Sequence, residues 1–349
     1  MQLGIFIPIG NNGWMMSTAA PQYLPSFELN RTVAERAEAA GFEFLLSMVK
    51  LRGFGGATEF WDHNLESFTL MAGLAAVTKK IQLYASVAIP TMNPAIVARM
   101  ASTIDDISGG RFGINIVSGW NQSEYVQMGV WPGDWYYDRR YEYSREFVTV
   151  MQELWRDGRS DLKGEFFTMD DCLLSPRPSA GKVPLVCAGQ SDVGMEFCAT
   201  YGDYQFIIGT ADLDVVRADA ARLGAAAAKT GRDVGVYVLF QITMGDTDAA
   251  AEAKWNGYRD AADLDAIAFM TGQANLDTSG ATAEKITEMK GAFNLNIGPI
   301  VGSHATIAAR LDEIAEIPGV AGVMCVFDDY PVATEEFGAK VMPLMKSRN

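Results

Sequence analysis

The chain has 349 residues, of which 49% are hydrophobic and 20% charged, and its formal net charge is −15 at pH 7. This is the composition of an ordinary globular protein with a sizeable core, so we do not expect disorder. The negative charge disfavours a nucleic-acid partner, which requires clustered Lys and Arg. No apolar run reaches the roughly 20 residues that span a bilayer, so we also expect no membrane partner.

The residue types that support metal or disulfide chemistry are scarce. Only two histidines are present, and the adjacent Asp328 and Asp329 are predicted to cap a helix, so we predict no metal site and favour chemistry carried by a cofactor. No C-x-x-C spacing occurs, and the chain opens on an apolar strand, so we predict a protein of the reducing cytoplasm. The four cysteines are Cys172, Cys187, Cys198 and Cys325.

Apolar segments of strand length alternate with helical patterns through the first 118 residues. Strands are expected at residues 3–9, 44–48, 81–87 and 111–118. Helices are expected at residues 32–40 and 65–77, and Gly41 ends the first of them. A third helix is expected after Asn93-Pro94, because Asn is a common helix cap and Pro is favoured at the first helical position. Four strand-helix units in a row predict a parallel sheet covered by helices.

The second part of the chain contains two irregular stretches. Residues 120–182 are rich in aromatic side chains and contain one expected helix at 139–155, whereas residues 254–297, which include Gly280, are expected to form a lid or an oligomer contact. Strands are expected at 183–188, 204–208, 236–244 and 320–327. The eight strands predict one α/β domain over residues 1–349, a (β/α)₈ TIM barrel with insertions after strands 4 and 7.

Two helix starts could hold a phosphate group. Gly189-Gln190-Ser191 lies where a strand passes into a helix, so its backbone N–H groups and the serine hydroxyl could bind an anion, although such a serine is usually only a helix cap. Arg140 and Tyr141 lie at the start of another helix, where the planar guanidinium of the arginine and the hydroxyl of the tyrosine could donate hydrogen bonds to a phosphate. The alternative for this pair is a solvated helix start.

Four polar side chains fall near the expected carboxyl ends of barrel strands, where barrel enzymes hold their active sites. Asn115 lies inside the fourth apolar strand, and either a site role or a hydrogen bond in the core would explain it. Ser86 lies near the end of the third strand. Lys50 follows the second strand and Glu124 follows the fourth; both should face the same mouth, unless they are exposed loop charges.

Six segments together resemble the pyrimidine oxygenases of the bacterial-luciferase-like flavin family. They are residues 7–14 (Ile-Pro-Ile-Gly-Asn-Asn-Gly-Trp), 50–56, 58–69, 107–113, 131–134 and 187–192. The resemblance implies a barrel monooxygenase that receives reduced FMN from a separate NADH-dependent flavin reductase. With O₂ as co-substrate, it would open the uracil ring between N3 and C4.

The resemblance also implies roles for individual positions. Ser86, which replaces a threonine of the family, and Asn115 would handle oxygen as the catalytic residues. Trp120 and Phe206 would line the substrate face. The FMN contacts would be Val49, Lys50, Asn115, Glu124, Arg140, Tyr141, Gly189, Gln190 and Ser191.

Departures from the family pattern fall in the loops at the mouth, so the resemblance does not determine which substrate the protein uses. Residues 118–125 are Ser-Gly-Trp-Asn-Gln-Ser-Glu-Tyr where the family has Thr-Gly-Trp-Gln-Lys-Pro-Glu-Tyr, and residues 209–212 and 294–303 also differ. Uracil and thymine are the first candidates. The alternatives are a riboflavin lyase that yields lumichrome and a ribose unit, and a non-catalytic flavin-binding barrel. We expect a homodimer or homotetramer.

Overall fold

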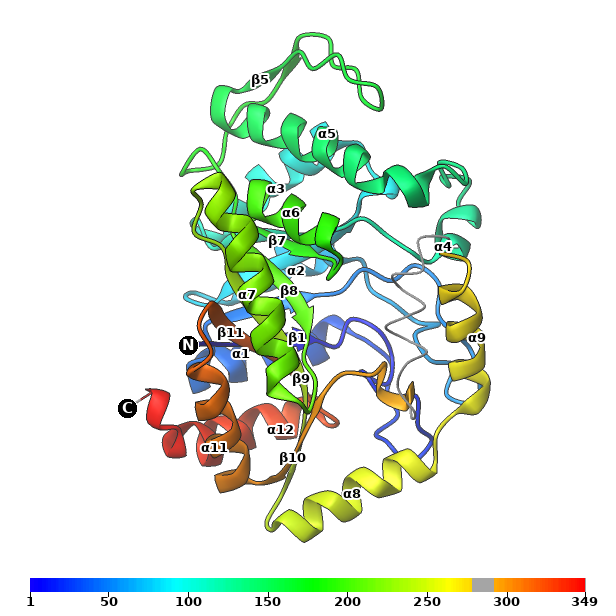
Figure 1. Ribbon diagram of the computed structural model, residues 1–349, viewed down its shortest axis with the longest axis vertical. Helices are drawn as coiled ribbons and strands as arrows, with labels where there is room; N and C mark the ends of the chain where they lie inside the picture. Colours follow the sequence, from blue (N-terminus) through cyan, green and yellow to red (C-terminus); the bar gives the residue numbers. More distant parts are fainter. Residues whose placement is uncertain (278–291, 349) are drawn as a thin grey trace.

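The eight predicted strands form one closed parallel barrel in the computed structural model, which describes residues 1–277 and 292–348. β8 pairs with β9, β9 with β11, and β11 with β1, so the sheet has no open edge within the barrel. This confirms the predicted (β/α)₈ fold (Figure 1). The barrel strands are β1 (Gln2–Ile7), β2 (Phe44–Ser47), β3 (Gln82–Ala88), β4 (Phe112–Val117), β7 (Leu185–Ala188), β8 (Tyr204–Ile208), β9 (Gly235–Gly245) and β11 (Val320–Val326).

Helices cover the outside of the barrel, and short polar side chains fix where most of them begin. Asn93 accepts a hydrogen bond from Ala95 N–H at the start of α3, as its sequence predicts, and Asp329 caps the short helix α12 by accepting from Val332 N–H. The outer helices are α1 (Phe27–Ala40), α2 (Ser67–Val77), α3 (Pro94–Ser108), α5 (Tyr136–Asp157), α6 (Asp192–Tyr201), α7 (Leu213–Thr230), α11 (His304–Ala315) and α12 (Tyr330–Glu336). None of the described helices combines the length and apolar character needed to cross a membrane.

The first insertion follows β4 and carries more structure than the one helix predicted for it. Besides α5, which begins at Tyr136 and not at 139, it contains the short helix α4 (Gln122–Val126) and an antiparallel pair, β5 (Arg159–Ser160) with β6 (Cys172–Leu173). Figure 1 shows β5 beyond one end of α5 and α4 beyond the other. The insertion therefore places α4 and the start of α5 beside the barrel mouth.

The second insertion is only partly irregular, so the prediction for residues 254–297 is wrong for much of its length. α8 (Asp248–Asp260) and α9 (Leu264–Ala274) are regular helices, capped by Thr247 and Asp263, whose side chains accept from Ala250 and Ala266 N–H. Thr and Asp are both common residues at the start of a helix, so the sequence contains a local signal for each of these helices. The strand β10 (Pro299–Ser303), which then adds to β9, was not predicted either. Gly280 and the other residues from 278 to 291 lie outside the described part of the chain.

Short turns complete the described backbone. They are the 3₁₀ turns Ile89–Thr91, Ala292–Asn294, Met342–Leu344 and Lys346–Arg348, and the π-helical turn Phe337–Val341.

Stacked aromatic side chains fill the barrel at the amino ends of its strands. The ring centroids of Tyr204 and Tyr237 are 4.1 Å apart, and those of Phe44 and Tyr237 are 4.3 Å apart. The neighbouring strands make room for these rings, since a Cβ on Gly4 would lie 2.3 Å from the Phe44 ring. A larger cavity lies at the opposite, carboxyl-terminal mouth, where barrel enzymes hold their active sites.

Candidate active site

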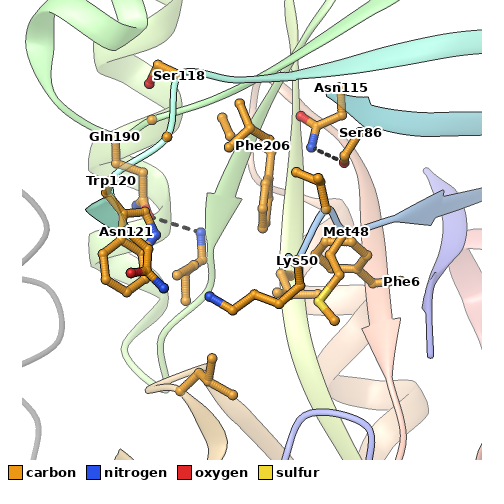
Figure 2. Close-up of a pocket in the computed structure, with 18 of the residues that line it drawn as sticks. Phe6, Met48, Lys50, Ser86, Asn115, Ser118, Trp120, Asn121, Gln190 and Phe206 are labelled. Carbon is orange, nitrogen blue, oxygen red and sulfur yellow. Dashed lines mark hydrogen bonds between the residues drawn. The ribbon is translucent and has the colours of Figure 1, made fainter. Parts of the chain in front are cut away.

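A cavity of about 660 Å³ lies at the carboxyl ends of the barrel strands. Its size is that of a cofactor or substrate pocket, and its walls come from strand ends, from α5 and α6, and from the second insertion. Figure 2 shows polar and aromatic side chains pointing into it. All twelve residues that the sequence predicts for the site line this cavity: Val49, Lys50, Ser86, Asn115, Trp120, Glu124, Arg140, Tyr141, Gly189, Gln190, Ser191 and Phe206.

Ser86 and Asn115 form a buried polar pair inside the barrel. They are register partners on the adjacent strands β3 and β4, and Asn115 Nδ2 donates to Ser86 Oγ at 2.8 Å (Figure 2). Ser86 Oγ in turn donates to the carbonyl of Ser47. Among the described residues, Asn115 Oδ1 has no hydrogen-bond partner. The pair therefore presents an uncompensated carbonyl oxygen at the wall of the cavity, which favours a site role over a core role for Asn115.

Lys50 and Glu124 form an ion pair that is buried, so neither is an exposed loop charge. Asn121 Nδ2 donates to Glu124 Oε1 at 2.9 Å, and Leu51 N–H donates to Oε2 at 3.0 Å. The Lys50 amino group lies 4.1 Å from the ring centroid of Phe54. Burial lowers the pKa of Lys50, although Glu124 opposes that effect. Asn121 was missed by sequence reasoning because a loop amide gives no periodic signal.

The turn between β7 and α6 has the form of an anion-binding turn. Gly189 has φ +132°, a conformation open to glycine, and a Cβ there would lie 2.4 Å from Tyr141 Oη. Ser191 caps α6 by accepting from Gly194 N–H at 3.2 Å. The turn thus brings a helix N-terminus and a tyrosine hydroxyl to one end of the cavity.

Two of the predicted cofactor contacts have their side-chain atoms engaged by the protein itself. Arg140 Nη1 lies 3.0 Å from Asp277 Oδ2 in a buried ion pair. Gln190 accepts from Ile208 N–H through Oε1 and donates to Asp219 through Nε2, so a contact to a cofactor would come from its backbone. Asp277 was missed because it is 137 residues away from Arg140 in the chain.

The remaining wall is apolar and aromatic. Phe206 packs edge-on against Phe6 with centroids 5.6 Å apart, and Phe6 contacts Trp14 at 4.5 Å. The second insertion adds Met270, Leu295 and Ile297. Flat rings and branched aliphatic side chains suit a planar, weakly polar ligand.

A closed (β/α)₈ barrel with a polar and aromatic cavity at its carboxyl-terminal mouth, beside a glycine turn at a helix N-terminus, belongs to the class of cofactor-dependent barrel enzymes. Within that class the chain belongs to the luciferase-like monooxygenase family, whose model matches residues 1–321. It is a flavin-dependent monooxygenase.

Curated relatives match the chain over its whole length. The pyrimidine monooxygenase RutA of Bradyrhizobium sp. is 58% identical over all of this chain and 98% of its own length. Those of Methylorubrum extorquens and Escherichia coli are 57% and 54% identical, each over all of this chain and 97% of the relative.

Solved structures share the fold at much lower identity. A riboflavin lyase (RcaE) with modified FMN and riboflavin superposes with a TM-score of 0.87 at 20% identity, over 100% of this chain and 92% of that one. An EDTA monooxygenase (EmoA) from Chelativorans sp. gives 0.80 at 19% identity, over 100% and 94%. These likenesses establish the fold.

Proposed function

We propose that this protein uses reduced FMN and O₂ to open the ring of a pyrimidine, with uracil and thymine as the first substrates. The observation that carries the proposal is the identity of 54–58% to pyrimidine monooxygenases across the full chain. The riboflavin lyase alternative has less support, because the likeness to that enzyme is 20% in sequence and extends to the fold alone.

The residues at the cavity fit FMN. The phosphate would lie at the β7–α6 turn, where the absence of a Cβ on Gly189 lets Tyr141 Oη approach the backbone closely, and where Ser191 begins a helix. Arg140, which precedes Tyr141 in α5 and also lines the cavity, would donate to the phosphate while keeping its ion pair with Asp277. Val49, Lys50, Asn115 and Glu124 would contact the rest of the cofactor. Bound reduced FMN would supply the electrons with which O₂ is activated.

The chain's own polar groups would orient the reactants. Asn115 and Ser86 are fixed in the strands by their mutual hydrogen bond, so they hold a donor and an acceptor in place before the reactants arrive. Trp120 and Phe206 would pack against the flat face of the pyrimidine. The remaining wall of the cavity is largely apolar, so a bound substrate would replace water at that wall.

Reduced FMN would come from a separate NADH-dependent flavin reductase, as the resemblance to two-component oxygenases implies. We also propose that the protein acts in the cytoplasm as a homodimer or homotetramer. Light scattering after gel filtration measures the assembly, and a mass of one chain would contradict this proposal.

The experiment is anaerobic mixing of the protein and reduced FMN with uracil, thymine or riboflavin, followed by an oxygen pulse and mass spectrometry. We expect a ring-opened ureidoacrylate from uracil or thymine, and none when oxygen is omitted. Lumichrome from riboflavin with unchanged uracil would instead identify a riboflavin lyase. If FMN binds but no substrate is converted, the barrel is a flavin-binding protein without this activity.

A further inference from the structure

Gln205 is a fully buried glutamine on the outer face of the barrel wall, next to the predicted phosphate turn. It is the second residue of β8, and its neighbours Tyr204 and Phe206 point into the barrel, so its own side chain points outward. Its register partner on β7 is Cys187. The residue therefore lies behind the turn that runs from β7 into α6, on the side away from the cavity.

The side-chain amide of Gln205 holds the backbone of that turn. Nε2 donates to the carbonyl of Gly189 at 2.8 Å and to that of Cys187 at 2.9 Å. A further carbonyl, that of Phe206, lies at 3.2 Å. Because all three neighbours are acceptors, they fix which end of the amide is the nitrogen.

Anchoring these carbonyls sets the direction of the N–H groups that follow them. A peptide unit is planar and trans, so its C=O and N–H point in opposite directions. With the Gly189 carbonyl held behind the turn by Gln205, the Gln190 N–H is directed to the other side, where Gly189, Gln190 and Ser191 line the cavity. Glycine at 189 permits the φ of +132° that this arrangement requires.

The anchoring has a cost in the fold itself. Gln205 Oε1 is buried and has no hydrogen-bond partner among the described residues. An unpaired buried acceptor costs free energy, and leucine, which has a similar size, would avoid that cost. A role in preparing the turn for a ligand accounts for a glutamine at this position.

We propose that Gln205 is a positioning residue for the phosphate of the cofactor: it pre-organises the β7–α6 turn so that its N–H groups bind the phosphate of FMN. The inference rests on the proposed use of FMN. It concerns the phosphate alone, so it predicts an effect that depends on whether the flavin carries one.

The test is to measure the Kd of Gln205→Leu for FMN and for riboflavin, which lacks the phosphate, by quenching of flavin fluorescence. We expect the Kd for FMN to be at least about tenfold higher in the variant than in the wild type. The Kd for riboflavin should change less than about twofold. A role limited to stability would move both constants together. Equal weakening of both flavins, or no change in either, would overturn the proposal.

Gln241 provides a matched control. It is also a fully buried glutamine with an unpartnered Oε1, and its Nε2 donates to the carbonyl of Val326, away from the phosphate turn. Gln241→Leu should therefore leave the ratio of the FMN and riboflavin constants unchanged. The two flavin Kd values are also measured for Gln205→Met, because methionine is flexible and fills the same space as glutamine. Circular dichroism verifies that each variant is folded.

The result is independent of turnover. If the wild type binds FMN but converts no pyrimidine, the proposed reaction fails while the role of Gln205 can still hold. If pyrimidine is converted and Gln205→Leu keeps the wild-type FMN constant, the role of Gln205 fails alone.

Discussion

At the scale of single residues, the cavity is defined by polar groups that are held in place before any ligand binds. Asn115 and Ser86 lie on two neighbouring strands, and both are buried. Lys50 reaches the same cavity from the loop after β2, and Glu124 reaches it from the short helix α4. A group fixed in this way does not have to reorganise during the reaction, which is the main source of electrostatic catalysis.

Removing the Ser86 hydroxyl should therefore impair the reaction more than the fold. In Ser86→Ala, Asn115 Nδ2 loses its acceptor and the amide is free to turn. We expect at least about a tenfold loss of ring-opened product per reduced FMN oxidised, with an FMN Kd close to the wild-type value. Product analysis and flavin titration measure the two quantities.

Ser102→Ala is the control for that variant. Ser102 is also buried, but among the described residues its hydroxyl donates only to the carbonyl of Ala98 within α3. Its product yield should equal that of the wild type. A wild-type yield from Ser86→Ala would remove Ser86 from the site.

At the scale of elements, side chains of one helix fix the loops of the next unit. Glu38, near the end of α1, accepts hydrogen bonds from the backbone N–H groups of Lys79, Lys80 and Ile81, which connect α2 to β3. Partial burial acts to raise the pKa of Glu38, but these hydrogen bonds and the nearby Arg111 outweigh it, so the pKa is lowered from its ordinary value of 4.5. The carboxylate therefore joins two consecutive strand-helix units.

Glu38→Gln should lower the free energy of unfolding by about 1–2 kcal/mol at pH 7, because charge-assisted hydrogen bonds are lost. A carboxylate whose folded-state pKa is lowered stabilises the protein above its ordinary pKa, and this stabilisation is lost as the pH falls through the lowered value. The difference between variant and wild type should thus shrink below pH 4.5. Urea unfolding at neutral and acid pH measures it.

Glu35→Gln, on the same helix, is the comparison. Its carboxylate is exposed and lies 4.0 Å from Arg31, a contact that contributes little. We expect nearly unchanged stability at both pH values. A Glu38→Gln difference that persists undiminished in acid would show that the lost interaction is not electrostatic.

At the scale of the whole molecule, the barrel is closed at one end by aromatic rings and open at the other. Closure depends on strand glycines, since a Cβ on Gly113 of β4 would lie 2.3 Å from the Tyr84 ring. The open end is completed by the insertions: Asp277, just after α9, pairs with Arg140 of α5, and Met270 of α9 lines the cavity. The core thus fixes the barrel, and the insertions shape the site.

Gly113→Ala tests the closed end. The added methyl group has no space, so we expect a loss of about 1–3 kcal/mol in the free energy of unfolding. Gly224→Ala is the matched control: it lies in α7 with open space around it, and alanine in a helix should be neutral or stabilise by up to about 1 kcal/mol. Equal stabilities of the two variants in urea unfolding would contradict the packing at this end.

Much of the barrel could be predicted from local patterns. Strands and outer helices were recognisable because apolar periodicity and capping residues such as Asn93 act over a few positions. The helix α9 was not predicted, although Asp263 caps it. Its stretch departs from the alternation of strands and helices in the barrel, so the barrel pattern does not predict it, although the capping residue is a local helix signal.

The sequence by itself determined the fold class, the family resemblance and the set of residues at the mouth, because each of these depends on local patterns and motifs along the chain. Only the tertiary structure decided how those residues are used. It paired Arg140 with Asp277, enclosed Lys50 with Glu124, and placed Gln205 behind the turn between β7 and α6. Such contacts join segments far apart in the chain, and burial gives them their strength, so no local pattern encodes them.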